Sequence, residues 1–110
     1  MKVLIVDDSK ADVMMIENML DGYDLLVAYD GIEAMESIEK NPDIEIMILD
    51  INMPRMNGFE VLEAIKNHPE HKKIATLILT NYDEIDNEIR GLELGALDYI
   101  RKPLNIRSIR

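Results

Sequence analysis

The chain has 110 residues, of which 47% are hydrophobic and 31% are charged, and this balance fits a single globular domain rather than a disordered segment. It has no cysteine and no apolar run approaching the roughly 20 residues that span a bilayer, which excludes disulfides, cysteine chemistry and membrane-spanning helices. We therefore expect a cytoplasmic protein. Its net charge of −10 repels nucleic acid and anionic membranes, so we expect no direct binding to either.

Short runs rich in β-branched residues predict five strands, separated by helical patterns. The predicted strands are Val3–Val6, Leu25–Tyr29, Ile44–Leu49, Ile74–Leu79 and Leu97–Ile100. Three of them are nearly continuous apolar runs, which predicts burial on both faces. Apolar residues three or four positions apart predict a helix with one apolar stripe in each intervening segment. In chain order the stripes are Val13, Ile16 and Leu20, then Ile32, Met35 and Ile38, then Phe59, Leu62 and Ile65, then Ile85, Ile89 and Leu92.

This alternation, repeated five times, predicts an α/β fold in which helices cover both faces of a doubly wound parallel sheet. Ser9 and Asp12 are spaced to cap the first helix, and Asn105 is placed to cap the last. Only the seven residues 104–110 remain for that last helix, whereas a mean helix has about 11–12. We therefore expect a helix that is cut short, and residues 1–110 to be the N-terminal domain of a longer protein.

Polar residues stand where the predicted strands end. Asp7 and Asp8 follow the first strand, Asp50 the third and Thr80 the fourth, and Lys102 comes shortly after the fifth. The carboxyl ends of parallel strands meet at one edge of the sheet, where such folds bind their ligands. Each residue alone has an ordinary explanation as a cap, a turn or a strand residue, but five polar residues at one edge indicate a site.

The chemistry of this set favours a divalent cation and an anionic ligand. Three carboxylates close together repel one another, so a pKa must rise or a cation must bind. Donors that are all oxygen favour Mg²⁺ or Ca²⁺. A divalent cation and Lys102 would neutralise the three carboxylates, and the site would then accept an anionic group. A cation, an ammonium and a hydroxyl are also what phosphoryl transfer requires.

Four motifs, spread over the whole chain at matching spacings, resemble the receiver domain of two-component response regulators. They are Val-Asp-Asp-Ser at 6–9, Leu-Asp-Ile-Asn-Met-Pro-Arg-Met-Asn-Gly at 49–58, Leu-Thr at 79–80 and Asp-Tyr-Ile-Arg-Lys-Pro at 98–103. The resemblance implies a flavodoxin-like sheet of five parallel strands in the order 2-1-3-4-5. It also implies a phosphoprotein that works as a switch in signal transduction.

The resemblance implies a role for each site residue. Asp50 would accept a phosphoryl group from a sensor histidine kinase, a phosphotransfer protein or a small acyl phosphate. The Mg²⁺ ligands would be Asp7, Asp8, Asp50 and the backbone carbonyl of Asn52. Thr80 and Lys102 would each bind a phosphoryl oxygen. Gly58 would serve the loop after the acceptor strand.

The resemblance also implies how the signal leaves the site. Tyr99 would move inward as Thr80 is drawn toward the phosphoryl group, and the peptide between Lys102 and Pro103 would be cis. The fourth helix, fifth strand and fifth helix would then control a C-terminal effector domain or a partner protein, and this surface leaves dimerisation open. Residues 81–95 and 101–107 resemble receivers joined to cyclic-dinucleotide enzymes.

Positions beside the acceptor depart from the usual family pattern. Asn81 follows Thr80 where the family usually has alanine or glycine, and Tyr82 comes next. Together with Asn52, two residues after the acceptor, these positions modulate dephosphorylation in the family. Our hypothesis is that Asn81 and Tyr82 restrict the attacking water.

Two other functions compete with the switch, which is not a turnover enzyme although it would catalyse its own phosphorylation and dephosphorylation. One is a pseudo-receiver that only docks partners, but its signature is a lost site residue and none of the five is lost. The other is a Mg²⁺-dependent phosphohydrolase with an aspartate nucleophile, but such enzymes carry Asp-x-Asp, and Asn52 stands where the second acid would be.

Two further groups invite a functional interpretation that we do not favour. His68 and His71 flank Pro69 and Glu70 in a predicted loop, where we expect them to be solvated. An acidic run opens the fourth predicted helix, and it consists of Asp83, Glu84, Asp86 and Glu88. We interpret this run as favourable charge at a helix N-terminus, in preference to a patch that faces a partner.

Overall fold

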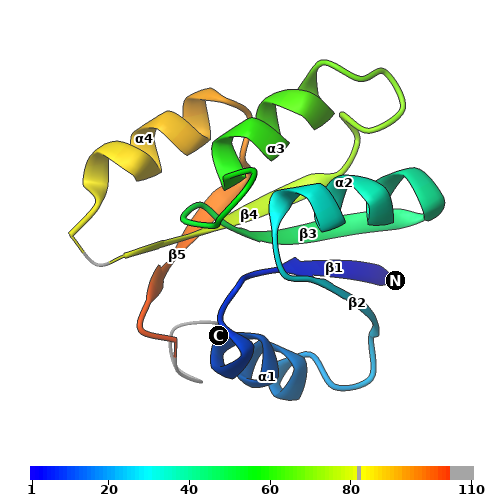
Figure 1. Ribbon diagram of the computed structural model, residues 1–110, viewed down its shortest axis with the longest axis horizontal. Coiled ribbons are helices and arrows are strands. Elements are labelled where there is room, and N and C mark those ends of the chain that lie inside the picture. The colour runs from blue at the N-terminus through cyan, green and yellow to red at the C-terminus, as the bar shows by residue number, and fades with distance from the viewer. Residues whose placement is uncertain (82, 105–110) are drawn as a thin grey trace.

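The computed structural model describes residues 1–81 and 83–104, and strands and helices alternate along it (Figure 1). The elements are β1 (Lys2–Val6), α1 (Lys10–Met19), β2 (Asp24–Ala28), α2 (Gly31–Lys40), β3 (Ile44–Asp50), α3 (Gly58–Lys66), β4 (Ala75–Asn81), α4 (Ile85–Glu93) and β5 (Asp98–Lys102). The predicted last helix with its Asn105 cap, and Tyr82, lie outside the described residues. None of the described helices is long and apolar enough to cross a membrane.

The five strands form one parallel sheet in the order β2-β1-β3-β4-β5. Figure 1 shows α2, α3 and α4 on one side of this sheet and α1 on the other. The doubly wound, flavodoxin-like fold that the sequence predicts is therefore confirmed. All carboxyl ends of the strands face the same edge, which fixes where the predicted site residues lie.

Each face of the sheet has its own apolar core. Alternate residues of β1 divide between them, since Leu4 and Val6 pack on the side of α2 and α3, whereas Val3 and Ile5 pack on the side of α1. All four side chains are at most 3% exposed. Burial on both faces explains why the central strands are nearly continuous apolar runs.

Helix α4 packs differently from its sequence prediction. The apolar stripe of Ile85, Ile89 and Leu92 is 57%, 51% and 41% exposed, whereas Glu88 and Gly91 face the sheet. A Cβ on Gly91 would lie only 2.2 Å from Cδ1 of Ile78 on β4, so the glycine allows a close approach of the helix to the strand. The apolar stripe does not face the core, because Gly91 and Glu88, whose carboxylate is held by Thr80 and Arg101, take the inner positions.

Candidate functional site

The carboxyl edge of the sheet brings three carboxylates together. Asp7 directly follows β1, Asp8 comes next, and Asp50 is the last residue of β3. One carboxylate oxygen of each lies within 4.8 Å of the others. Asp7 and Asp50 are buried, whereas Asp8 is exposed. The predicted acids therefore form one cluster, with Asp8 on its solvent side.

Lys102, at the end of β5, reaches into this cluster. Its Nζ lies 3.0 Å from Oδ2 of Asp7 and 3.6 Å from Oδ2 of Asp50. It also lies 3.0 Å from Oδ2 of Asp12, a fourth carboxylate that we considered only as part of a helix cap. The sequence could have indicated this contact, because Asp12 lies in the first turn of α1 and that turn begins at the same edge of the sheet. The peptide between Lys102 and Pro103 is cis.

The electrostatics of the cluster shift two pKa values. The pKa of Asp50 is raised to about 7, chiefly by burial and then by the negative charge of Asp7, and the nearby Lys102 ammonium opposes both effects. Burial alone would lower the pKa of Lys102, but its contacts with Asp7 and Asp12 outweigh burial and raise it. Near neutral pH, Lys102 is therefore charged, and Asp50 is balanced between its two forms.

The donor set of the cluster fits a hard divalent cation. Oδ1 of Asp7 accepts a hydrogen bond from the backbone N–H of Ser9 at 2.9 Å. Oδ2 of Asp7 is buried, and among the described residues its one polar contact is the ionic one with Lys102 at 3.0 Å. A buried carboxylate oxygen of this kind, beside two further carboxylates, is the environment in which Mg²⁺ binds.

A glycine holds the chain close behind Asp50. A Cβ on Gly58 would lie 2.5 Å from the backbone oxygen of Asp50 and 2.7 Å from Cα of Ile51. The backbone N–H of Gly58 donates to the carbonyl of Ile51 at 3.0 Å, which closes the loop between β3 and α3. Any larger residue at this position would push β3 and α3 apart.

The same loop is fastened to the start of α2. Arg55 has a positive φ of 64°, and its Nε donates to Oδ2 of Asp30 at 2.9 Å. The backbone N–H of Gly31 donates to the carbonyl of Met56 at 3.1 Å. Sequence reasoning gave none of these residues a role, because nothing local relates positions 30 and 55.

A single carboxylate connects two of the residues that the resemblance assigns to rate modulation. Glu84 accepts hydrogen bonds from the amide of Asn52, at 3.2 Å, and from the amide of Asn81. It also accepts one from the amide of Asn87 in the first turn of α4. Asn81 is exposed at the end of β4, so this cluster of amides around Glu84 lies at the rim of the site.

Thr80 is buried, and its hydroxyl already has a partner. Its Oγ1 donates to Oε2 of Glu88 at 3.0 Å, and Arg101 holds the same carboxylate. Arg101 lowers the pKa of Glu88, which keeps the carboxylate ionised. Glu88 lies in the first turn of α4, as we expected of the acidic run, but it is only 3% exposed and is held by Thr80 and Arg101. The partner that explains its burial comes from β5 and is not local in sequence.

Tyr99 lies next to this ion pair. Its side chain is half-buried and packs against the larger apolar core, and the Arg101 guanidinium carbon lies 5.5 Å from the centre of its ring. In the sheet, Thr80 pairs with Arg101, and Ile78 pairs with Tyr99. Thr80 and Tyr99, the two residues to which the resemblance assigns the switch, are thus joined through Glu88 and Arg101.

An open depression of about 530 Å³ lies beside the acid cluster. The residues that line it are Asp8, Ile51, Asn52, Met53, Pro54, Asn57, Phe59, Asn87 and Arg90. Arg90 stacks over Phe59, with its guanidinium carbon 4.2 Å from the ring centre. Asp8 and Asn52 therefore face an open space beside the acid cluster.

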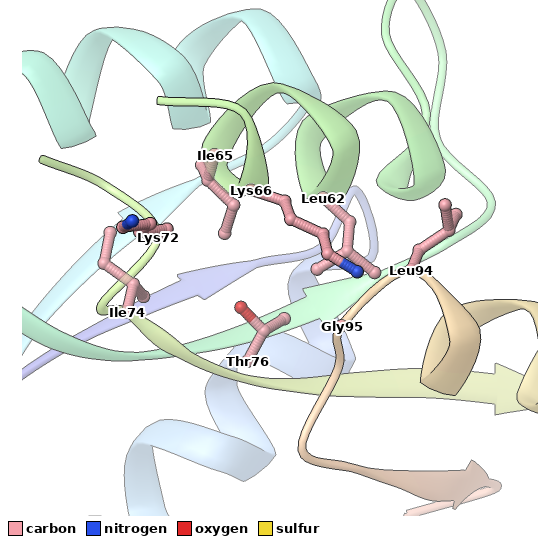
Figure 2. Close-up of a pocket in the computed structure, with 8 residues that line it drawn as sticks. All are labelled: Leu62, Ile65, Lys66, Lys72, Ile74, Thr76, Leu94 and Gly95. Carbon is pink, nitrogen blue, oxygen red and sulfur yellow. The ribbon is translucent and has the colours of Figure 1, made fainter. Parts of the chain in front are cut away.

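A second cavity, of about 300 Å³, lies at the opposite end of β4 (Figure 2). Figure 2 shows Leu62 and Ile65 pointing from α3 toward Thr76, beside Leu94 at the end of α4. The hydroxyl of Thr76 is buried there, and none of the described residues forms a hydrogen bond with it. No carboxylate or imidazole lines this cavity, so we assign the chemistry to the other end of the strand.

We expected both histidines to be solvated, but this expectation is wrong for His71. His71 is only 7% exposed, and its ring stacks on that of His68 with centroids 3.9 Å apart and planes 16° from parallel. Glu39 lies 3.6 Å from Nε2 of His71, which places three potential metal ligands together. Imidazole lone pairs lie in the ring plane, so two rings stacked this way cannot both point at one ion about 2 Å away. The stack therefore serves packing.

Comparison with known proteins relates the whole chain to one family. A family model described as "Response regulator receiver domain" matches residues 3–110. A protein of Vibrio cholerae serotype O1 named "Probable cyclic di-GMP phosphodiesterase" is 38% identical over 109 residues. That alignment covers 98% of this chain but only 24% of the relative, so the chain spans about a quarter of its length.

Solved structures agree with the family model. The chemotaxis response regulator CheY4 of Vibrio cholerae is 34% identical with a TM-score of 0.89, and the match covers 98% of this chain and 91% of that one. The structure of a complex of CheX, CheY, BeF3 and Mg²⁺ from Borrelia burgdorferi contains a chain that is 30% identical with a TM-score of 0.89. That match covers 98% of this chain and 82% of the other.

Proposed function

Because the chain belongs to the response regulator receiver domain family, we propose that it is a signalling switch whose Asp50 accepts a phosphoryl group. The observation that carries this proposal is the burial of Asp50 beside Asp7, within reach of the Lys102 ammonium. A carboxylate nucleophile, an ammonium and oxygen ligands for a cation are the groups that phosphoryl transfer uses. The proposed donor is a sensor histidine kinase or a phosphotransfer protein, the kinds of partner with which receiver domains interact.

Asp50 supplies the nucleophile. One of its carboxylate oxygens forms a bond to phosphorus, while the bond from phosphorus to the donor breaks and its electron pair leaves with the donor. Lys102, now 3.6 Å from the Asp50 carboxylate, pairs with a phosphoryl oxygen, and Thr80 donates its hydroxyl to another. To reset the switch, water attacks phosphorus and loses a proton to solvent, and Asp50 leaves as a carboxylate.

The cation in this proposal is Mg²⁺. Its ligands are Asp7, Asp8, Asp50 and the backbone carbonyl of Asn52. When bound, Mg²⁺ neutralises the charge on the phosphoryl oxygens. Two observations support it: Oδ2 of Asp7 is buried beside two further carboxylates with only the Lys102 ammonium against it among the described residues, and the related complex from Borrelia burgdorferi has Mg²⁺ in its name. Through its charge, Mg²⁺ would also favour the ionised form of Asp50, which is the nucleophile.

The proposed output is a change in the surface formed by α4 and β5. Thr80 lies at the site, Tyr99 lies on β5, and the Glu88–Arg101 ion pair joins them. This surface would control an effector, either joined to the receiver or bound by it. The printed name of the Vibrio relative makes an enzyme of cyclic di-GMP metabolism our proposed class of effector.

The two competing functions receive less support. A docking module does not need a carboxylate whose pKa burial has raised, or a lysine placed among three acids. An Asp-nucleophile phosphohydrolase needs a second acid two residues after the nucleophile, whereas the amide of Asn52 donates to Glu84 at the rim.

Intact-mass spectrometry after incubation with acetyl phosphate and Mg²⁺ tests the proposed function. We expect one phosphoryl adduct on the wild type, and none on Asp50→Asn or in EDTA. Asp43→Asn is a matched control, because Asp43 is an exposed acid whose ion pair is with Lys2, away from the acid cluster. An adduct that survives in Asp50→Asn, or a wild type that takes none, would overturn the proposal.

A further inference from the structure

We propose that Glu88 is a positioning residue that holds the Thr80 hydroxyl away from the phosphorylation site at rest, and that Arg101 is the latch that keeps Glu88 in place. This inference rests on the proposed function, since it concerns how the phosphoryl group recruits Thr80. It concerns residues of α4 and β5 to which the motifs of the chain assign no role. The contacts, the donor count and the register of the sheet carry it.

The contacts form a closed network around one carboxylate. Oε2 of Glu88 accepts from the Thr80 hydroxyl at 3.0 Å and from Nε of Arg101 at 2.7 Å, and Oε1 accepts from Nη2 of Arg101 at 3.0 Å. The guanidinium thus grips both oxygens, the geometry in which arginine binds carboxylates most specifically. A carboxylate that is 3% exposed and held by a fork cannot turn to follow Thr80 without breaking that pair.

The donor count makes the two partners of Thr80 exclusive. A threonine hydroxyl has one proton to donate, and a phosphoryl oxygen and a carboxylate are both acceptors. Thr80 therefore gives its proton either to Glu88 or to the phosphoryl group. Every contact that Glu88 makes with Thr80 stabilises the resting state, and phosphorylation must overcome it.

The register of the sheet shows how release of the latch would reach Tyr99. Thr80 and Arg101 are paired on the neighbouring strands β4 and β5, and Tyr99 lies two residues before Arg101. The Arg101 guanidinium lies over the Tyr99 ring as well as against Glu88. When Thr80 leaves, Glu88 loses its one partner on β4 and keeps only the one on β5. The ion pair and Tyr99 can then move together.

The test measures the affinity of the Mg²⁺-loaded chain for beryllofluoride, a phosphoryl mimic, in wild type and in Glu88→Gln. The neutral amide accepts a weaker hydrogen bond from Thr80 and keeps the size of the side chain, so we expect the affinity to rise about fivefold to tenfold. Glu93→Gln is the matched control, because it removes one exposed acid from the same helix and should leave the affinity unchanged. Urea unfolding of each variant shows that the fold is retained.

A double-mutant cycle separates the latch from a simple charge effect. Removing a negative charge near the site favours any anion, and that effect would persist when Thr80 is replaced by valine. The latch acts through the Thr80 hydroxyl, so Glu88→Gln should change nothing in a Thr80→Val background. An equal effect in both backgrounds, or no effect in the wild type, would overturn the proposal.

The two proposals fail in different ways. A wild type that accepts phosphate on Asp50 but responds to Glu88→Gln no differently from Glu93→Gln refutes the latch alone. A wild type that takes neither phosphate nor beryllofluoride refutes the proposed function, and the latch with it.

Discussion

The ammonium of Lys102 lies 3.0 Å from the carboxylate of Asp12, closer than the 3.6 Å that separates it from Asp50. Asp12 thus competes with the proposed acceptor for its cation. Both side chains of this contact are largely buried, so its removal is felt inside the site rather than at the surface. The first prediction follows from this competition.

We expect Asp12→Asn to raise the affinity for beryllofluoride severalfold, because Lys102 can then turn to the phosphoryl mimic without giving up an ion pair with Asp12. Stability should change by no more than about 1 kcal/mol, since Lys102 keeps its contact with Asp7. Fluorescence or NMR titration in Mg²⁺ measures the affinity, and Glu17→Gln, an exposed position on the same helix, is the control. An unchanged affinity would show that Asp12 does not hold Lys102 back.

The raised pKa of Asp50 predicts a pH-dependent penalty on folding in metal-free buffer. The carboxyl binds its proton more tightly when folded, with a pKa of about 7 against 3.8, so stability falls as pH rises from about 4 to about 7. Asp50→Asn removes this penalty. We expect it to match the wild type near pH 4 and to exceed it at pH 8, by at most about 4 kcal/mol.

Urea unfolding in EDTA across this pH range measures that difference. Adding Mg²⁺ at pH 8 should stabilise the wild type and leave Asp50→Asn unchanged, which ties the penalty to the cation site. A stability difference that is the same at every pH would contradict the raised pKa.

Asn81 is predicted to slow the loss of the phosphoryl group. Its amide donates a hydrogen bond to Glu84 at the rim of the site, where we expect it to restrict the water that attacks phosphorus. We expect Asn81→Ala to shorten the lifetime of the phosphorylated form severalfold, measured by mass spectrometry after acetyl phosphate is removed. Asn18→Ala, on the exposed surface of α1, is the control. An unchanged lifetime in Asn81→Ala would contradict this role of Asn81.

Thr76 and Thr80 offer a contrast in one strand. Both are at most 2% exposed, but the hydroxyl of Thr80 has Glu88, whereas that of Thr76 has no hydrogen-bond partner among the described residues. We expect Thr76→Val to stabilise the fold by about 1 kcal/mol, because it removes a buried hydroxyl that is not hydrogen-bonded. Thr80→Val should destabilise it, since it leaves Glu88 one donor short. Urea midpoints measure both, and a loss of stability in Thr76→Val would contradict the first expectation.

The strands and the acid cluster could be predicted because their causes are local. A strand buried on both faces must be a run of apolar residues, as in β1 and β3, and the carboxyl ends of parallel strands must meet at one edge. Asp7, Asp8 and Asp50 were placed by those two facts alone. The structure confirms that the three carboxylates converge and adds that their oxygens lie within 4.8 Å of one another.

The partners that complete the site could not be predicted, because they are set by packing. Glu88 and Arg101 lie 13 residues apart, and only the seating of α4 on β5 brings them together. Periodicity finds the apolar stripe of α4, but it does not show that Gly91 allows a closer approach than the stripe would. His71 resembles a loop residue in sequence, and only the stacked ring of His68 explains its burial.

The packing of α4 also differs from that of the other described helices in what stabilises it. Helix α4 supplies no buried side chain to either apolar core, since its inward residues are a glycine and an ion-paired glutamate. Local opening of this helix would therefore leave both cores intact, and its free energy is set by a few polar contacts. We therefore expect α4 to be the least costly of the described helices to rearrange, while β1, β3, β4 and the other described helices keep the two cores packed.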